Sequence, residues 1–260
     1  TIFFRDIKNP SIEFVLVDTY NMTPNESDTF LAHMKSTQEY LYQLQEFGIA
    51  HNFLSDDLVF LLHPYQWPAK HDFSTSFFDG FCNARGYGFA QDDAKTFSGV
   101  TMAARQFARL LGANADNIGG CQGSSYLMAN IRSSSYEHIL SNCSKRDIQK
   151  KLQRIKNCSC LRTDLSGPVI STYFPSHFLS KEDICTLQND NYTFCDKFGK
   201  EQTEAFVLHC YVACCANGTN AKPFLILAPD GTKSEQCQLC LAGKCTNETT
   251  ASLGSTAEQD

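Results

Sequence analysis

The distribution of cysteine limits what this chain can fold into more than any other feature of its sequence. Thirteen cysteines occur among 260 residues, yet only three of them precede residue 157. The other ten are Cys158, Cys160, Cys185, Cys195, Cys210, Cys214, Cys215, Cys237, Cys240 and Cys245. This density is typical of an oxidising compartment and of a segment too small to be stabilised by a hydrophobic core alone. The sequence therefore predicts a disulfide framework there. Because the total is odd, at least one thiol is free or pairs with another chain.

Glycosylation sequons point to the same compartment. The pattern Asn-x-Ser/Thr occurs seven times, at Asn21, Asn25, Asn142, Asn157, Asn191, Asn217 and Asn247. Together with the cysteines, these sequons predict a secreted, extracellular protein. Thr1 begins no charged and then apolar leader, so we expect a chain that is already processed or was trimmed for expression.

Charge and hydropathy argue against two kinds of partner. The net charge of −6 argues against nucleic acid, because phosphate binding needs a basic patch. No apolar run approaches the roughly 18 to 20 residues of a membrane span. An apolar fraction of 42% is enough to supply a core. We therefore expect a folded protein whose partners are neither nucleic acids nor membranes.

Alternating strand and helix patterns predict an α/β domain before residue 157. Continuous apolar runs predict buried strands over Ile12–Asp18, Asp57–Leu62 and Ser76–Cys82. Apolar residues at helical spacing predict helices over Ser27–Phe47, Ser98–Ala113 and Lys145–Ile155. Ser27 and Ser144 are the expected caps, and Gly112 is expected to end its helix. The paired Asp56-Asp57 and Asp92-Asp93 are interpreted as turn residues rather than acid/base or calcium sites. The sequence thus divides into residues 1–157, a cysteine-rich domain over 158–246 and a polar tail over 247–260.

The segment Thr96–Asp116 resembles the active-site helix of the reprolysin, or adamalysin, branch of the metzincin metalloproteases. Those enzymes carry Phe-Ser-Gly, a short spacer and then His-Glu-x-x-His-x-x-Gly-x-x-His-Asp. Tyr126–Met128 is similar to the family's Met-turn, and Ser141–Ile148 is similar to the start of its last helix. Asp230–Cys245 is similar to the cysteine-rich segment of relatives with thrombospondin motifs and of secreted salivary metalloproteases of ticks. The resemblance implies a metzincin-like mixed sheet with helices, followed by a small disulfide-rich, loop-rich domain.

The catalytic chemistry of that motif is missing from this chain. With Gly112 as the anchor, the zinc-ligand positions are Arg105, Arg109 and Ala115, and the general-base position is Gln106. Arginine keeps its proton to a pKa above about 12, alanine has no donor atom, and an amide cannot take a proton from water at neutral pH. Gly112, Asp116 and Met128 keep the family's residues. We therefore expect no bound zinc and no peptidase activity.

The two arginines carry a hypothesis of their own. At positions i and i+4 on one helix, Arg105 and Arg109 both point into the former metal cavity, where a guanidinium can pair with a carboxylate or a sulfate. The hypothesis is a relic cleft that holds an acidic group from this chain or from a partner. The alternative is that the cleft has closed and both arginines are solvated.

The resemblance also implies a disulfide pattern. It pairs Cys121 with Cys143, and it pairs Cys82 with either Cys158 or Cys160. Nine cysteines then remain for the cysteine-rich domain, so the odd thiol is expected there. Relatives have a cysteine where this chain has Ser234, and Cys237 stands where their pattern has none. Cys237 has either taken over the lost bridge or is the unpaired cysteine.

These observations lead to one main prediction of function and two alternatives. The main prediction is a secreted pseudoprotease that acts by binding an extracellular protein. The resemblance to salivary proteins points to a host plasma or immune protein, such as a haemostasis or complement factor, as the target. One alternative is an active zinc endopeptidase with non-standard ligands. The other is a decoy or structural module that binds protease inhibitors or substrates without cleaving them.

Overall fold

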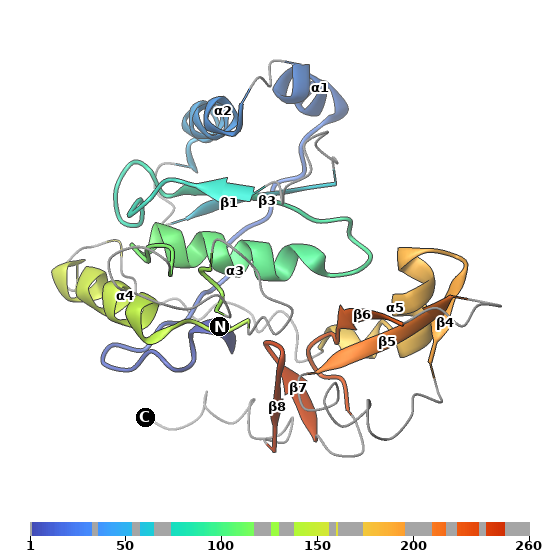
Figure 1. The fold of residues 1–260 in the computed structure, drawn as a ribbon. Helices are drawn as coiled ribbons and strands as arrows, with labels where there is room; N and C mark the ends of the chain where they lie inside the picture. Colours follow the sequence, from blue (N-terminus) through green and yellow to red (C-terminus); the bar gives the residue numbers. More distant parts are fainter. Residues whose placement is uncertain are drawn as a thin grey trace.

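The computed structural model describes residues 2–32, 36–53, 58–64, 74–116, 126–129, 138–155, 160, 174–195, 210–216, 223–233 and 238–247. In the N-terminal part, a small sheet lies between helix α2 on one face and helix α3 on the other (Figure 1). The C-terminal part holds one helix and two small antiparallel sheets beside α3 and the N-terminus. The protein is thus an α/β fold followed by a disulfide-rich region.

The sheet of the N-terminal part has the strand order β1-β3-β2. Strands β1 (Val59–His63) and β3 (Tyr87–Gln91) are parallel, while β2 (Ser74–Ser76) runs antiparallel to β3 and forms one edge. β1 is the strand predicted over Asp57–Leu62, although its last residue is His63 and Asp57 lies outside the described residues.

The strand predicted over Ser76–Cys82 is wrong, because β2 ends where that prediction begins. Asp79 and Cys82 adopt left-handed backbone conformations, with φ of 56° and 60°. The backbone N–H groups of Asp79 and Phe81 donate to the carbonyls of Arg109 and Leu110 at 3.1 Å. The backbone N–H groups of Asp79 and Phe81 therefore find their hydrogen-bond acceptors at the end of α3 rather than in a neighbouring strand.

The predicted helix over Ser27–Phe47 is two helices, α1 (Pro24–Ala32) and α2 (Thr37–Ala50). The Ser36 hydroxyl accepts a hydrogen bond from the N–H of Glu39, so Ser36 caps a new helix in the middle of the predicted one. The cap predicted at Ser27 is formed by Thr23 instead, whose side chain and N–H both bond Glu26.

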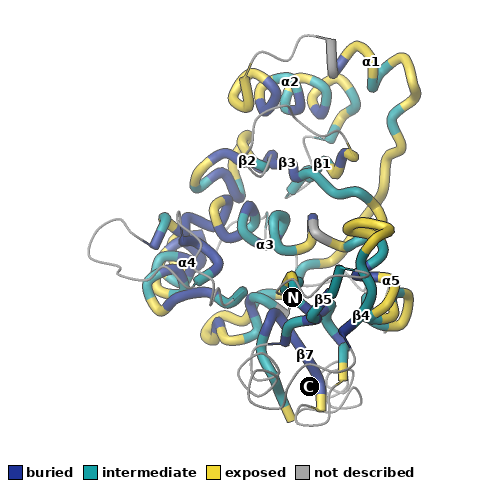
Figure 2. The backbone as a smooth tube through the Cα atoms, turned by 45° about the vertical axis from the view of Figure 1, so that its right-hand side comes forward, coloured by how far each residue is buried: buried dark blue, intermediate teal, exposed yellow. Residues whose placement is uncertain are grey.

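The strand predicted over Ile12–Asp18 is also wrong: these residues are neither helix nor strand. Phe14 packs against Phe4 and Phe107, but Val15, Leu16 and Val17 are exposed, and Figure 2 shows this stretch in yellow on the way to α1. A β-branched sequence becomes a strand only where a neighbouring strand completes its hydrogen bonds, and no described strand pairs with it.

Two cores hold the N-terminal part together. Tyr40, Leu41 and Leu44 of α2 pack onto the sheet residues Tyr87 and Phe89. On the other face, α3 (Ser98–Leu110) packs against α4 (Asn142–Ile155) and against residues near the N-terminus. The predicted apolar stripe of α4 is buried, although the helix begins three residues before Lys145 and its cap is Ser141, not Ser144.

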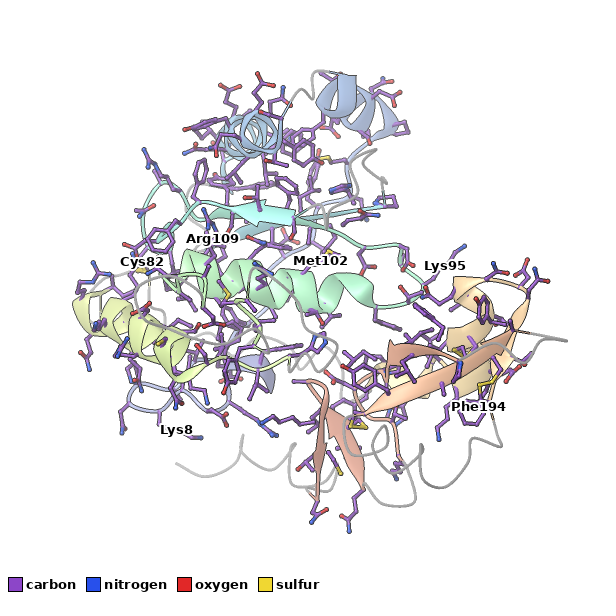
Figure 3. All side chains as sticks on the ribbon, viewed as in Figure 1. Lys8, Cys82, Lys95, Met102, Arg109 and Phe194 are labelled. Atoms are coloured by element: carbon purple, nitrogen blue, oxygen red, sulfur yellow. A yellow bond between two sulfur atoms is a disulfide. The ribbon has the colours of Figure 1, made fainter. Side chains whose placement is uncertain are left out.

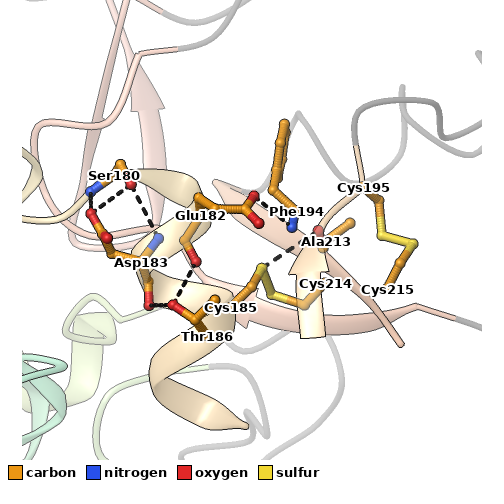
Figure 4. Close-up of a disulfide and its surroundings, with 10 residues drawn as sticks. All are labelled: Ser180, Glu182, Asp183, Cys185, Thr186, Phe194, Cys195, Ala213, Cys214 and Cys215. Carbon is orange, nitrogen blue, oxygen red and sulfur yellow. Dashed lines mark hydrogen bonds between the residues drawn. A yellow bond between two sulfur atoms is a disulfide. The ribbon is translucent and has the colours of Figure 1, made fainter. Parts of the chain in front are cut away.

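The C-terminal part is built on disulfides. It contains a short 3-10 helix (Pro175–His177), α5 (Lys181–Gln188), a sheet of β4 (Tyr192–Phe194), β5 (Tyr211–Ala216) and β6 (Phe224–Leu227), and a hairpin of β7 (Leu239–Leu241) and β8 (Lys244–Thr246). Cys185–Cys214 and Cys195–Cys215 tie α5 and the end of β4 to β5 (Figure 4), and Cys210–Cys240 joins the hairpin. Ser180 and Asp183 cap α5 reciprocally. The small core of this part includes four of these cysteines.

No helix among the described residues is long and apolar enough to cross a membrane.

Candidate functional site

Helix α3 carries three of the four positions that the resemblance marks as catalytic, and both of its ends are fixed by local hydrogen bonds. At its start, a carboxylate oxygen of Asp92 accepts from the N–H of Gly99 at 2.8 Å. Asp93 accepts from the N–H groups of Lys95 and Thr96, as expected for turn residues, and these bonds lower the pKa of its carboxyl against the opposing effect of burial. The loop before α3 is therefore shaped by its paired aspartates.

The C-terminal end of α3 is a Schellman motif. Gly112 has φ +86°, its N–H donates to Arg109, and the N–H of Ala113 donates to Ala108. The predicted helix over Ser98–Ala113 therefore ends three residues earlier, at Leu110, with Gly112 in the left-handed conformation just beyond it. This turn directs the chain towards Ala115 and Asp116.

Gln106, at the general-base position, is buried and bonded to the edge strand β2. The Ser76 hydroxyl donates to its Oε1 at 2.9 Å, and its Nε2 donates to the Ser74 hydroxyl at 3.0 Å. The residue is only 5% exposed. Both ends of the amide are thus used to join α3 to β2.

Arg109, at the second ligand position, also reaches β2. Figure 3 shows it near the end of α3, between that helix and the sheet. Its Nε donates to the carbonyl of Ser76 at 3.1 Å, and its guanidinium carbon lies 5.8 Å from the centre of the Phe78 ring. Phe77 bonds β3 through its N–H, so the alternation of an antiparallel pair directs the Ser76 carbonyl away from β3. Arg109 therefore covers an outward-facing carbonyl of the edge strand.

The two arginines influence each other. Although Arg109 is exposed along part of its length, partial burial of the guanidinium lowers its pKa, and the positive charge of Arg105 lowers it further. Among the described residues, the side chain of Arg109 makes one hydrogen bond, to the carbonyl of Ser76.

The turn after α3 is anchored by a buried carboxylate. Asp116 is 1% exposed and accepts hydrogen bonds from the hydroxyls of Ser141 and Ser144, the latter at 3.1 Å. Its N–H donates to the carbonyl of Met128 at 3.1 Å. Met128 is buried in the core below α3 and lies in a turn closed by a bond from Ala129 to Tyr126. The retained Asp116 and Met128 therefore connect α3, this turn and the start of α4.

The structure places three of the four predicted positions on α3 and the fourth outside it, and the side chains of Gln106 and Arg109 contact β2. Arg105, Gln106 and Arg109 occupy one turn of α3, whereas Ala115 lies beyond the Schellman turn. Ser74, Ser76 and Phe78, which contact these side chains, were not predicted. Their only sequence signal is the alternating Ser-Thr-Ser, which places two hydroxyls on one face of a strand.

The predicted disulfides and sequons fall partly within the described residues. A disulfide joins Cys82 to Cys160, one of the two alternatives. Cys143 and Cys245 are disulfide-bonded to partners outside the described residues, where Cys121, Cys158 and Cys237 also lie. Five sequon asparagines are exposed, namely Asn21, Asn25, Asn142, Asn191 and Asn247, while Asn157 and Asn217 lie outside the described residues.

Comparison with known proteins identifies the family. A model of the Reprolysin (M12B) family of zinc metalloproteases matches residues 17–164, which is more than half of the chain. The chain therefore belongs to the reprolysin family. No curated protein matches it. The α/β part with its mixed sheet and the disulfide-rich region that follows are consistent with a metzincin-like domain and a small cysteine-rich domain.

The residues at the zinc positions do not fit the metal that the family name implies. A zinc site needs three side chains with lone pairs, and Arg105, Arg109 and Ala115 offer none. The Oε1 of Gln106 already accepts a hydrogen bond from Ser76. Across the described part of the chain, no three His, Cys, Asp or Glu side chains are grouped so as to hold a metal ion. We therefore derive no catalytic step through zinc.

Proposed function

We propose that this protein is a secreted pseudoprotease, a reprolysin that binds another extracellular protein and does not cleave peptide bonds. The observation that carries the proposal is the hydrogen bonding of Gln106 and Arg109. Both side chains join α3 to β2, so two former catalytic positions now have structural partners. The disulfides and the exposed sequon asparagines support an oxidising, extracellular location with attached glycans.

The relic cleft around Arg105 and Arg109 is part of this proposal. Two guanidinium groups one turn apart repel each other, and an anion placed between them relieves that repulsion. A carboxylate of the partner is the group that we propose to bind there. Replacing both arginines by alanine is expected to weaken capture of the partner. Normal binding of every partner by that double variant would rule out the relic cleft as a binding site.

The partner that we propose is a host plasma or immune protein, on the strength of the resemblance to salivary metalloproteases. A pull-down from plasma with the purified, glycosylated protein identifies it. Capture of a haemostasis, complement or immune factor supports the effector role. Capture of a protease inhibitor alone would favour the decoy alternative.

Metal content and cleavage test the loss of catalysis. We expect far less than stoichiometric zinc by mass spectrometry of the purified protein, and no chelator-sensitive cleavage of a peptide library. The matched control restores the motif with Arg105→His, Gln106→Glu, Arg109→His and Ala115→His, and it is expected to bind more zinc than the wild type. Stoichiometric zinc and chelator-sensitive cleavage in the wild-type protein would establish the active endopeptidase instead.

A further inference from the structure

A second surface of the protein, which shares Arg109 with the relic cleft, combines arginines with aromatic rings. Two of its rings, Tyr42 and Phe78, are exposed, whereas Phe77 is buried. It consists of Tyr42 on α2, Phe77 and Phe78 after β2, Arg85 before β3 and Arg109 on α3, and we term it the arginine–aromatic band. The ring centres of Tyr42 and Phe77 lie 5.4 Å apart. The guanidinium carbon of Arg85 lies 5.9 Å from the centre of the Phe77 ring, and that of Arg109 lies 5.8 Å from the Phe78 ring. Tyr42 and Phe78 are nearly half exposed, at 49% and 46%.

The backbone that presents the band is held on several sides. The loop between β2 and β3 bonds the end of α3 through Asp79 and Phe81, and the side chain of Gln45 on α2 donates to the carbonyl of Ala84. The Cys82–Cys160 disulfide fixes its centre. A surface that is already ordered loses little conformational entropy when a partner binds, which favours binding.

The charges around the band limit what it can bind. Arg85 and Arg109 are exposed, and Arg105 adds a third cation on α3. The nearby Asp79 is neutralised by Lys151 at 3.0 Å and Arg154 at 3.6 Å from the same oxygen. Glu39 and Glu46 flank Tyr42 on α2 at positions i−3 and i+4. The band is therefore positive at its centre and acidic along its α2 border.

The segment that forms the band contains no glycosylation sequon. No sequon occurs between residues 26 and 141, a stretch that includes every residue of the band. The nearest sequon on α4 is at Asn142, nine residues before Lys151, which contacts the loop. Nine residues of helix correspond to about 13 Å.

We propose that the arginine–aromatic band docks an extended polypeptide segment of the partner in which carboxylate side chains alternate with apolar ones. This inference rests on the proposed binding function and names the chemistry of its partner. The carboxylates pair with Arg85 and Arg109, and the apolar side chains cover the exposed rings of Tyr42 and Phe78. Arginine, tyrosine and other aromatic residues are the types that carry most of the binding energy in protein interfaces.

A polypeptide fits the band better than a sulfated polysaccharide. A polysaccharide offers no apolar side chain for Tyr42 and Phe78, and its continuous negative charge is repelled by Glu39 and Glu46. An alternating peptide needs only isolated carboxylates, which matches separate arginines with rings between them.

The test uses a fluorescent synthetic peptide of alternating glutamate and leucine and the full-length, glycosylated protein. We expect anisotropy to show saturable binding that weakens with salt. We expect the affinity for the peptide to fall about tenfold or more in the double variant Arg85→Gln/Arg109→Gln. We expect the same loss in the double variant Tyr42→Ser/Phe78→Ser. Matched controls are Arg146→Gln on the exposed face of α4 and Phe178→Ser, whose ring is 64% exposed away from the band. Both controls should bind like the wild type.

Four other outcomes would contradict the proposed binding of the peptide by the arginine–aromatic band. These outcomes are no binding of the peptide, equal binding by all variants, equal binding of a lysine–leucine peptide, and band-dependent binding of heparin in place of the peptide. Circular dichroism of each variant confirms folding, and Arg85→Lys, which keeps the charge, should retain more binding than Arg85→Gln. If the peptide fails to bind while the protein lacks zinc and cleavage, the band is wrong and the pseudoprotease stands. Zinc-dependent cleavage of the library would remove the proposed function itself.

Discussion

Gln106 differs from the family's glutamate by one atom, but that atom changes what the residue can do in the fold. The amide has both a donor and an acceptor group: its Nε2 donates to Ser74 and its Oε1 accepts from Ser76. A carboxylate at this position would offer no donor to Ser74 and would bring a charge into a site that is 5% exposed. The replacement therefore stabilises the contact between α3 and β2.

The variant Gln106→Glu tests this role. We expect it to lower the free energy of unfolding by about 1–3 kcal/mol, because it buries a charge and loses a hydrogen bond, and to create no peptidase activity. Urea denaturation measures the change. Gln153→Glu on the exposed side of α4 is the matched control and should alter stability by no more than about 0.5 kcal/mol. A Gln106→Glu variant as stable as the wild type would contradict the structural role.

At the scale of elements, a residue with left-handed backbone conformation lies near each end of α3, a glycine at one end and an alanine at the other. Gly112 has φ +86°, and a Cβ added there would lie 2.9 Å from a carboxylate oxygen of Asp79. Ala94 has φ 56° in the exposed turn before α3. The first position needs glycine, whereas the second holds an alanine under strain.

Substitutions at these two positions should therefore act in opposite directions. Gly112→Ala is expected to lower the melting temperature, at a cost of about 1–2 kcal/mol. Ala94→Gly should leave stability unchanged or raise it slightly, since the strain that it relieves offsets the extra freedom of the unfolded chain. Thermal denaturation of both variants checks the pair. Equal losses in the two variants would show that α3 does not end as described.

Strand β1 also contributes a pH dependence through its last residue. His63 is buried between the rings of Tyr40 and Phe89, and burial lowers its pKa from 6.5 to about 4. The unfolded chain therefore binds the proton first. Stability from this group is present above pH 6.5 and is lost as the pH falls towards 4, with a full effect on the order of 3 kcal/mol.

Urea denaturation between pH 7 and pH 4.5 measures this effect. We expect His63→Leu to flatten the fall in stability across that range, whatever its effect at pH 7. His177→Gln, at an exposed histidine, should leave the slope as it is. An unchanged slope in His63→Leu would show that other groups cause the acid sensitivity.

At the scale of the whole molecule, the disulfides determine how many thiols remain. All ten cysteines among the described residues are disulfide-bonded, eight of them to one another, and the partners of Cys143 and Cys245 come from the three that lie outside those residues. Those three are Cys121, Cys158 and Cys237. Because the total of thirteen is odd, at least one cysteine of the chain has no partner within it.

Intact mass after alkylation without reduction should show one modified cysteine in the monomer. Peptide mapping then decides among Cys121, Cys158 and Cys237. A disulfide-linked dimer on a non-reducing gel would place the same cysteine in a bond between chains. Three modified cysteines would contradict the pairing described for Cys143 and Cys245.

The sequence by itself determined the properties that depend on residue chemistry. The loss of every metal-ligating side chain at Arg105, Arg109 and Ala115 follows from the residue types alone, as does the turn role of Asp92 and Asp93. The left-handed Gly112 and the buried stripe of α4 also follow, because caps and helical periodicity are encoded over a few residues.

The tertiary structure decided what depends on distant partners. Ile12–Asp18 has the composition of a strand but no strand beside it, and Phe77–Cys82 bonds the end of α3 instead of a sheet. The contacts of Gln106 and Arg109 with Ser74 and Ser76 join residues about thirty positions apart. Hydrogen-bond partners so far apart in sequence are chosen only when the chain packs, so local patterns could identify the substituted zinc-site positions but not the contacts that these residues make.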